Sequence, residues 1–166
     1  ARLLDAALAA RPDEPALLYA RSLVSERRGN VAAVERDLRH MLRLDPQNAL
    51  ALNALGYSLA NLTPRHAEAL ELIERALALR PDDPAIIDSM GWVLYRLGRH
   101  DEALLQLRRA FEAFPDHEVA AHLGEVLWVG GAREEAREVW RQGLQTRPDS
   151  RLISDTMRRL GAEPSP

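Results

Sequence analysis

The five histidines are the side chains most able to bind a metal ion or to move a proton. A helical zinc site of the protease type needs two histidines four residues apart with an adjacent glutamate, and no HExxH segment occurs. The closest pair lies five residues apart, and such residues diverge around a helix. We therefore expect no metal site, and we expect all five to be surface residues: His40, His66, His100, His117 and His122.

The other reactive residue types also lack a catalytic arrangement. Serine, histidine and aspartate are present, but in no recognisable nucleophile motif. The Gly130-Gly131 pair is typical of a turn that ends a helix rather than of a phosphate-binding loop. The absence of cysteine excludes thiolate catalysis, cysteine-ligated zinc and disulfides. The sequence therefore predicts a protein that is not an enzyme and that binds no cofactor.

Charge and hydropathy exclude two further classes of partner. All 22 basic residues are arginines, they occur singly or in pairs, and the formal net charge is −3, so nucleic acid is not an expected partner. The apolar runs are far shorter than the roughly 20 residues that cross a bilayer, so no transmembrane segment is expected. Because the chain begins at Ala1 rather than at Met, we expect it to be part of a longer protein with targeting signals upstream.

Prolines that recur at nearly constant intervals indicate which secondary-structure elements would position any site. The intervals between them are 34, 35, 34 and 33 residues, and Asp or Gln follows each one. A fixed period of this length indicates a repeat architecture. The prolines are Pro12, Pro46, Pro81, Pro115 and Pro148.

Each interval contains two segments with helical apolar spacing, as in Ala69, Ile73 and Ala76. The first helix of a pair carries a recurring glycine at Gly56, Gly91 or Gly124, where a residue without a side chain lets two backbones approach closely. The predicted pairs are 15–28 with 31–44, 49–61 with 65–79, 84–97 with 100–113, and 118–129 with 132–146.

The turns inside the pairs have their own signals. Gly29, Gly98 and Gly131 suit the left-handed residue that ends a first helix. The second pair departs from this pattern, because residues 61–66 replace the glycine turn and add one residue.

Both ends of the chain are expected to differ from the repeats. Residues 1–11 match only a second helix, with Leu4, Ala7 and Leu8 in packing positions, and should expose an apolar face. Residues 150–160 predict a capping helix with Ser150 as N-cap. In that helix we expect Leu152, Ile153, Met157 and Leu160 to face inward and Arg158 and Arg159 to face outward.

These features resemble the tetratricopeptide repeat, a 34-residue helix pair with the pattern W-x2-L-G-x2-Y, A-x3-F and P. The third repeat matches best, and the first is poorer because Arg21 and Ser22 stand where Leu and Gly are expected. The residues of the third repeat at the signature sites are Ile87, Met90, Gly91, Leu94, Ala103, Leu107 and Pro115.

The resemblance implies an all-α fold: a right-handed superhelix of antiparallel helix pairs, closed by a C-terminal capping helix. The expected divisions are a partial repeat at 1–14, four repeats at 15–48, 49–83, 84–116 and 117–149, and the capping helix with its tail at 150–166.

More narrowly, the segments NALGYSLA and AAHLGEVLWVGGAREEAREVW resemble the C-terminal region of proteobacterial tetratricopeptide lipoproteins. This resemblance implies an adaptor on the periplasmic face of the outer membrane, anchored through upstream sequence. Its implied partners are a carboxyl-terminal processing protease and the cell-wall hydrolases that the protease cuts. A cytoplasmic location is the alternative.

In the family, the open face of each first helix lines a concave groove that binds protein or peptide segments. Five of the eight aromatic residues are expected on that side, and the alternative is that they fill space between successive first helices. The Lys and Asn clamp that some members use for a terminal carboxylate is absent, and Asp88 and Glu125 should make the groove mildly acidic. The predicted groove residues are Tyr19, Leu23, Asn53, Tyr57, Asp88, Trp92, Tyr95, His122, Glu125 and Trp128.

Two other functions remain open. The chain could be the regulatory repeat region of a larger enzyme, such as a glycosyltransferase, or a self-associating structural array that forms a homo-oligomer.

Overall fold

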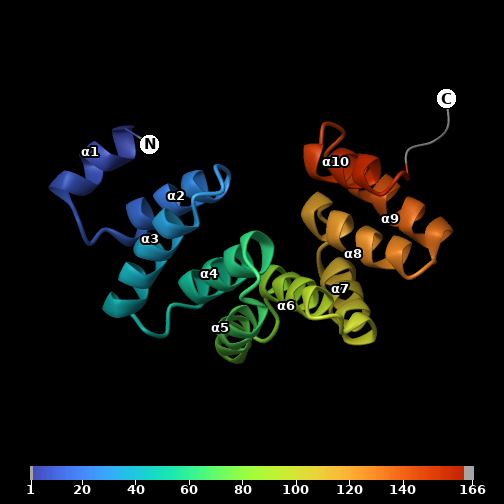
Figure 1. Cartoon of the computed structure of the whole chain (residues 1–166), viewed down its shortest axis with the longest axis horizontal. Helices are drawn as coiled ribbons and strands as arrows, with labels where there is room; N and C mark the ends of the chain where they lie inside the picture. The colour runs from blue at the N-terminus through green and yellow to red at the C-terminus, as the bar shows by residue number, and fades with distance from the viewer. Residues whose placement is uncertain (1, 163–166) are drawn as a thin grey trace. The chain divides into compact units, whose positions relative to one another are not determined.

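A computed structural model describes residues 2–162, and its regular structure in that range is entirely α-helical (Figure 1). The predicted all-α fold of helix pairs is therefore confirmed. The chain divides into two compact units, Ala1–Pro81 and Asp82–Pro166, and each unit is considered separately below.

The first unit holds one single helix followed by two pairs. Short turns join the two helices of each pair, which pack against each other along their length. Helix α3 also packs on α4, so that consecutive pairs share one apolar core. The helices are α1 (Arg2–Ala10), α2 (Pro15–Glu26), α3 (Val31–Leu44), α4 (Ala49–Leu62) and α5 (His66–Leu79).

The second unit holds two pairs and then a single short helix. The first helices of the two pairs, α6 and α8, also contact each other, and α10 packs on α8 and α9. The helices are α6 (Pro84–Arg96), α7 (His100–Ala113), α8 (His117–Val129), α9 (Arg133–Thr146) and α10 (Arg151–Arg159).

Every predicted helix is present, and no boundary differs by more than two residues. The largest difference is at the end of α2, predicted at residue 28 and observed at Glu26. There the chain tightens, because the amide of Gly29 donates to the carbonyl oxygen of Glu26 at 2.8 Å in a three-residue turn.

The helix termini follow the predicted capping chemistry. Gly29, Gly98 and Gly131 have φ angles of 66°, 77° and 89°, so each first helix of these pairs ends in the left-handed conformation that glycine tolerates best. The side chain of Ser150 accepts a hydrogen bond from the amide of Ile153 and caps α10, as predicted.

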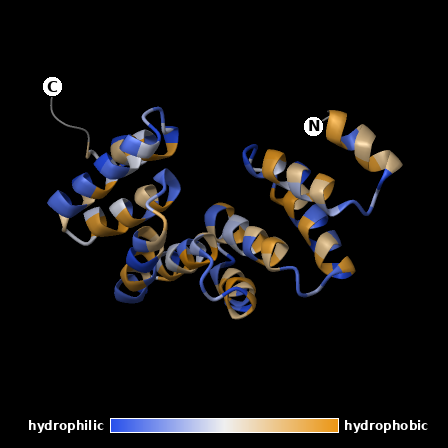
Figure 2. Ribbon diagram, turned by 180° about the vertical axis from the view of Figure 1, so that it is seen from behind, coloured by the Kyte–Doolittle hydropathy of each residue, from blue (hydrophilic) through white to orange (hydrophobic). Residues whose placement is uncertain are grey.

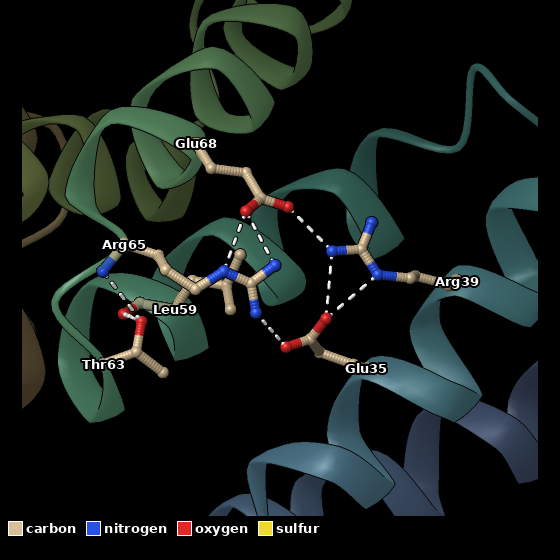
Figure 3. Close-up of polar contacts among 6 residues, drawn as sticks. All are labelled: Glu35, Arg39, Leu59, Thr63, Arg65 and Glu68. Carbon is tan, nitrogen blue, oxygen red and sulfur yellow. Dashed lines mark hydrogen bonds and ion pairs between the residues drawn. The ribbon is translucent and has the colours of Figure 1, made fainter.

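The turn after α4 replaces glycine with a threonine (Figure 3). The Thr63 hydroxyl donates to the carbonyl oxygen of Leu59 at 2.7 Å and accepts from the amide of Arg65 at 3.1 Å. The Thr63 side chain thus bonds a carbonyl oxygen of α4 that also accepts from the Thr63 amide, and it fixes the approach to α5.

Close approach within the pairs depends on the predicted glycines. A Cβ atom at Gly56 would lie 2.6 Å from Ile73 Cγ1, and one at Gly91 would lie 2.5 Å from Leu107 Cγ. At Gly124 the nearest atom would be Trp140 Nε1, at 2.1 Å, and the Trp140 side chain is fully buried. In Figure 2 hydrophobic and hydrophilic residues alternate along the ribbons of the paired helices.

The first repeat, which lacks the signature Leu and Gly, is held by an ion pair instead. Arg21 donates to both oxygens of Asp37 at 2.8 Å, and Asp37 is 1% exposed. Although burial opposes ionisation of Asp37, its hydrogen bonds to Arg21 and Arg36 hold the pKa of this carboxyl below its usual value. Arg21 also contacts Asp5 of α1 at 2.9 Å and thereby ties α1 to the first pair.

The end helices match the predictions in part. In α1, Leu8 is buried while Leu3 is 88% exposed, as expected for a helix that leaves apolar surface open. In α10, Ile153 is buried, but Leu152 is 38% exposed, so its predicted inward position is wrong. Leu152 directly precedes Ile153, and adjacent helical residues point in different directions.

Within residues 2–162, the helices are too short and too polar to cross a membrane.

Substituting Gly124 by Ala should destabilise the second unit by about 1–3 kcal/mol, because the new methyl group would collide with the rigid indole of Trp140. Urea denaturation followed by far-UV circular dichroism measures this change. Gly130→Ala is the matched control: its φ is −73° and its nearest contact would be 3.3 Å away, so its effect should stay below about 1 kcal/mol. Equal effects of the two substitutions would contradict the role assigned to Gly124.

Candidate partner-binding surface

All ten predicted groove residues lie on first helices of the pairs. In the first unit they come from α2 (Tyr19, Leu23) and α4 (Asn53, Tyr57). All four of these side chains are half-buried, so part of each is open to a ligand. The Oδ1 atom of Asn53 is buried and has no hydrogen-bond partner among the described residues.

In the second unit the predicted residues interact with one another across α6 and α8. His122 Nδ1 lies 2.8 Å from Asp88 Oδ2 and 3.0 Å from Asp88 Oδ1. The ring of Trp92 stacks on the His122 ring with centroids 4.4 Å apart and an interplanar angle of 26°. These contacts bind one first helix to the next.

Four of the predicted groove residues are buried, so the expectation that they line an open groove is wrong. Asp88, Trp92, His122 and Glu125 are 7%, 6%, 4% and 5% exposed. The Trp92 ring fills space between successive first helices, which is the alternative that the sequence left open for such rings. His122 likewise corrects the expectation that every histidine lies on the surface, because the indole and the carboxylate enclose it.

The charge of His122 follows from this enclosure. Burial of the imidazole opposes its charging, but Asp88, with smaller contributions from Glu118 and Glu125, outweighs this effect and raises the pKa of His122. When His122 is protonated, the cluster is an ion pair under an aromatic ring, and the negative charge of Asp88 is compensated.

The negative charge of Glu125 is likewise balanced by a basic residue, one that was predicted to face outward. Arg159 of α10 donates through Nη1 to Glu125 Oε1 at 3.0 Å and through Nη2 to Oε2 at 2.5 Å. Tyr95 contributes a longer contact, from its hydroxyl to Glu125 Oε1, at 3.4 Å. The expected mild acidity is therefore absent here, because Asp88 and Glu125 each have a basic partner.

Trp128 keeps part of its ring exposed at the end of α8. Its centroid lies 5.7 Å from that of Trp140, and the guanidinium carbons of Arg133 and Arg137 lie 5.2 Å and 5.1 Å from its centroid. Such distances are within the range of cation–π attraction. Both arginines are otherwise exposed on α9.

The contacts that sequence reasoning missed share one signal. Both the Asp88 to His122 pair and the Glu125 to Arg159 pair join residues 34 apart, which is one repeat length. A search for opposite charges at that spacing on first helices would have found them.

Second helices also carry a charge network in the first unit (Figure 3). Arg39 of α3 donates to Glu68 of α5 at 2.7 Å and to Glu35 at 3.0 Å. Arg65 contacts both Glu35 and Glu68, so positive and negative groups alternate around a closed ring. Because these side chains are 20–41% exposed, the network contributes modestly to stability and serves mainly to align the helices.

The remaining histidines show no metal-binding arrangement. His40 lies 2.7 Å from Asp13, and His117 Nδ1 lies 3.1 Å from the Ser150 hydroxyl. Among residues 2–162, no three His, Cys, Asp or Glu side chains are grouped closely enough to hold a metal ion.

The raised pKa of His122 predicts that the second unit loses stability as pH rises. The ion pair contributes fully below the unfolded pKa of about 6.5, and its contribution disappears as pH rises through the higher folded pKa. Denaturation between pH 5.5 and 8.5 should therefore show a decreasing free energy of unfolding that His122→Gln abolishes. His100→Gln, at an exposed histidine, should leave the slope unchanged. A slope that survives His122→Gln would contradict the assignment.

Burial of Trp92 predicts that Trp92→Ala destabilises the second unit by about 3–5 kcal/mol, because it leaves a cavity beside His122. Phe114→Ala is the matched aromatic control: Phe114 is 58% exposed, so its loss should change stability by less than about 0.5 kcal/mol. Urea midpoints of both variants test this, and an unchanged midpoint for Trp92→Ala would show that the ring does not support the fold.

Comparison with known proteins agrees with this architecture. Two family models, both described as tetratricopeptide repeat, match residues 47–116 and 89–151. The TPR repeat-containing protein PA4667 of Pseudomonas aeruginosa is 55% identical over 114 residues, which are 69% of this chain and 19% of that protein. Protein O-mannosyl-transferase TMTC1 of Homo sapiens is 26% identical over 164 residues, which are 96% of this chain and 18% of that protein. The chain thus spans less than a fifth of the length of these relatives.

Solved structures support the same fold. TTC0263, a thermophilic tetratricopeptide repeat protein of Thermus thermophilus, superposes with a TM-score of 0.82 at 20% identity, covering 97% of this chain and 87% of that one. An O-GlcNAc transferase of Thermobaculum terrenum gives a TM-score of 0.63 at 29% identity, covering 68% of this chain and 22% of that one. The 34-residue helix pairs, their close-approach glycines and these matches together show that the chain belongs to the tetratricopeptide repeat family.

Proposed function

We propose that this chain is a scaffold that holds segments of partner proteins against the first helices of its repeats. Tetratricopeptide repeats imply protein–protein interaction in general. The observation that carries the proposal here is that each of these first helices holds one half-buried aromatic ring: Tyr19 on α2, Tyr57 on α4, Tyr95 on α6 and Trp128 on α8.

A partly exposed ring on each first helix is suited to anchor a ligand. An aromatic side chain presents a large contact area with few rotatable bonds, and interface anchors are enriched in Tyr and Trp. Many aliphatic residues are buried between the two helices of a pair, as Ile73 and Leu107 are at 0% exposure. The four rings, together with Leu50 of α4 and Val129 of α8, therefore remain as apolar surface on the first helices.

The charges of the second unit favour an apolar or aromatic ligand segment over a strongly basic one. Asp88 and Glu125 are already paired with His122 and Arg159. A basic ligand would have to compete with these internal partners. An extended or helical segment with apolar anchors fits the surface best.

In finer detail, we propose an adaptor that binds a carboxyl-terminal processing protease and brings it cell-wall hydrolases. The resemblance of two segments to proteobacterial tetratricopeptide lipoproteins supports this role, and so does the 55% identity to a tetratricopeptide repeat protein of Pseudomonas aeruginosa. The same resemblance supports a periplasmic location at the outer membrane. The chain itself would be a non-enzymatic part of that system.

A second candidate is a regulatory repeat region within a larger enzyme. It is favoured by the similarity to an O-mannosyl-transferase over 96% of the chain, since that relative is more than five times longer than the matched region. Transferase activity of the whole gene product, measured with and without residues 1–166, distinguishes this candidate from the adaptor.

The scaffold proposal predicts that Tyr57→Ala and Trp128→Ala each weaken binding to the purified processing protease or its hydrolase. Loss of an aromatic anchor costs about 2 kcal/mol, or roughly 30-fold in Kd. Isothermal titration calorimetry measures the affinity, and circular dichroism confirms that each variant is folded. Phe114→Ala, an exposed ring at the end of a second helix, should bind like the unmodified chain.

Equal losses at Phe114 and at the first-helix rings would contradict the proposed surface. Sedimentation of the chain alone tests the self-associating alternative. A concentration-dependent dimer that Trp128→Ala abolishes, with no binding to either protein, would replace the scaffold by a homo-oligomeric array.

A further inference from the structure

Helix α10 is bound to the second unit through one face only. Ile153 and Thr156 on that face are 0% and 6% exposed, whereas Leu152 is 38% exposed and the side chain of Arg158 is 64% exposed. Helices α6 and α8 are each covered by a second helix where Gly91 and Gly124 allow close approach.

At the equivalent position α10 carries an arginine. Gly124 stands eight residues after the N-cap Asp116, and Arg158 stands eight residues after the N-cap Ser150. The Arg158 side chain is largely exposed and pairs with Asp155, so α10 lacks the glycine that allows close approach in α8. No helix covers this face of α10 within residues 2–162, so its detachment breaks fewer contacts than that of α6 or α8.

The contact between α10 and the surface beneath it has three features. Gly143 of α9 leaves room for Ala120 of α8 and for Ile153, since a Cβ at Gly143 would lie 2.5 Å from Ala120 Cβ and 2.8 Å from Ile153 Cδ1. Thr156 is a small residue at the point of contact, one turn further along. Glu125, whose side chain is 6% exposed, receives both terminal nitrogens of Arg159, whose own side chain is 56% exposed.

We propose that α10 is a displaceable occupant of a docking surface on α8 and α9, and that this surface accepts an amphipathic helix of a partner protein. The partner helix carries an aliphatic residue, a small residue and an arginine at successive three-residue intervals, as Ile153, Thr156 and Arg159 do. The acid Glu125 selects the arginine, and the room at Gly143 selects the aliphatic residue. This inference rests on the proposed scaffold function and names one class of its ligands.

The arrangement makes α10 an internal competitor. A tethered helix has a high effective concentration, so a partner helix binds only when it offers additional contacts or when α10 is weakened. The half-buried ring of Tyr95, whose hydroxyl contacts Glu125, borders the surface and offers such a contact. Displacement would not leave Glu125 as an unpaired buried charge, because the incoming arginine replaces Arg159.

The experiment uses the full chain and a synthetic peptide of residues 150–162 as the partner helix. Arg159→Glu places a second acid beside Glu125 and should release α10, whereas Arg158→Glu changes the neighbouring exposed arginine and serves as the matched control. Hydrogen exchange of the α10 amides should be at least tenfold faster in Arg159→Glu than in Arg158→Glu, with α6 to α9 still protected. By calorimetry, the peptide should bind Arg159→Glu at least tenfold more tightly than it binds the unmodified chain.

A peptide that itself carries Arg159→Glu should bind at least tenfold more weakly than the unmodified peptide. If Arg159→Glu unfolds the second unit, Arg159→Ala provides the same comparison without the added acid. Unchanged exchange in α10, or a released α10 without peptide binding, would overturn the proposal. Protease binding through Tyr57 and Trp128 is measured separately. If the peptide does not bind but the protease still does, only the proposed α10 surface is contradicted, and the scaffold function is not.

Discussion

The architecture depends on the contact distance between the two helices of each pair. At Gly56, Gly91 and Gly124 the side chain of the second helix lies where a Cβ atom would be, so any larger residue separates the pair. Because the large aliphatic residues of this contact and Trp140 are buried between the helices, the sides that face away from the contact carry the polar residues and the half-buried rings. The same packing rule that builds the repeat therefore decides which residues are available for binding.

Successive first helices are joined by a different kind of contact. In the second unit, Asp88 with His122 and Glu125 with Arg159 form two charge pairs that each span one repeat length. Removing one member would leave a poorly solvated charge, which costs more than the intact pair contributes. These pairs therefore act chiefly by specifying which helix follows which. In the first unit, Arg21 and Asp37 do the same within a pair whose glycine has been replaced by Ser22.

The fold could be predicted almost completely from the sequence, because it depends on local features: periodic prolines, apolar spacing, capping residues and turn glycines. The site could be predicted only to the level of the helix face. All ten residues lie on first helices, yet Trp92 and His122 are buried against each other, since spacing gives the direction of a side chain and not what the next repeat places in front of it. Arg159 is exposed, as predicted, but its ion pair with Glu125 was not predicted, because that partner lies on a different helix.

The placement of the three indoles has a practical consequence. Trp92, Trp128 and Trp140 all belong to the second unit, and the first unit contains tyrosine but no tryptophan. Excitation at a wavelength that tyrosine does not absorb thus yields intrinsic emission from one half of the chain only, while ellipticity reports on both halves. Comparing the two signals in a single melt reveals whether the halves of the array lose their structure together or one after the other.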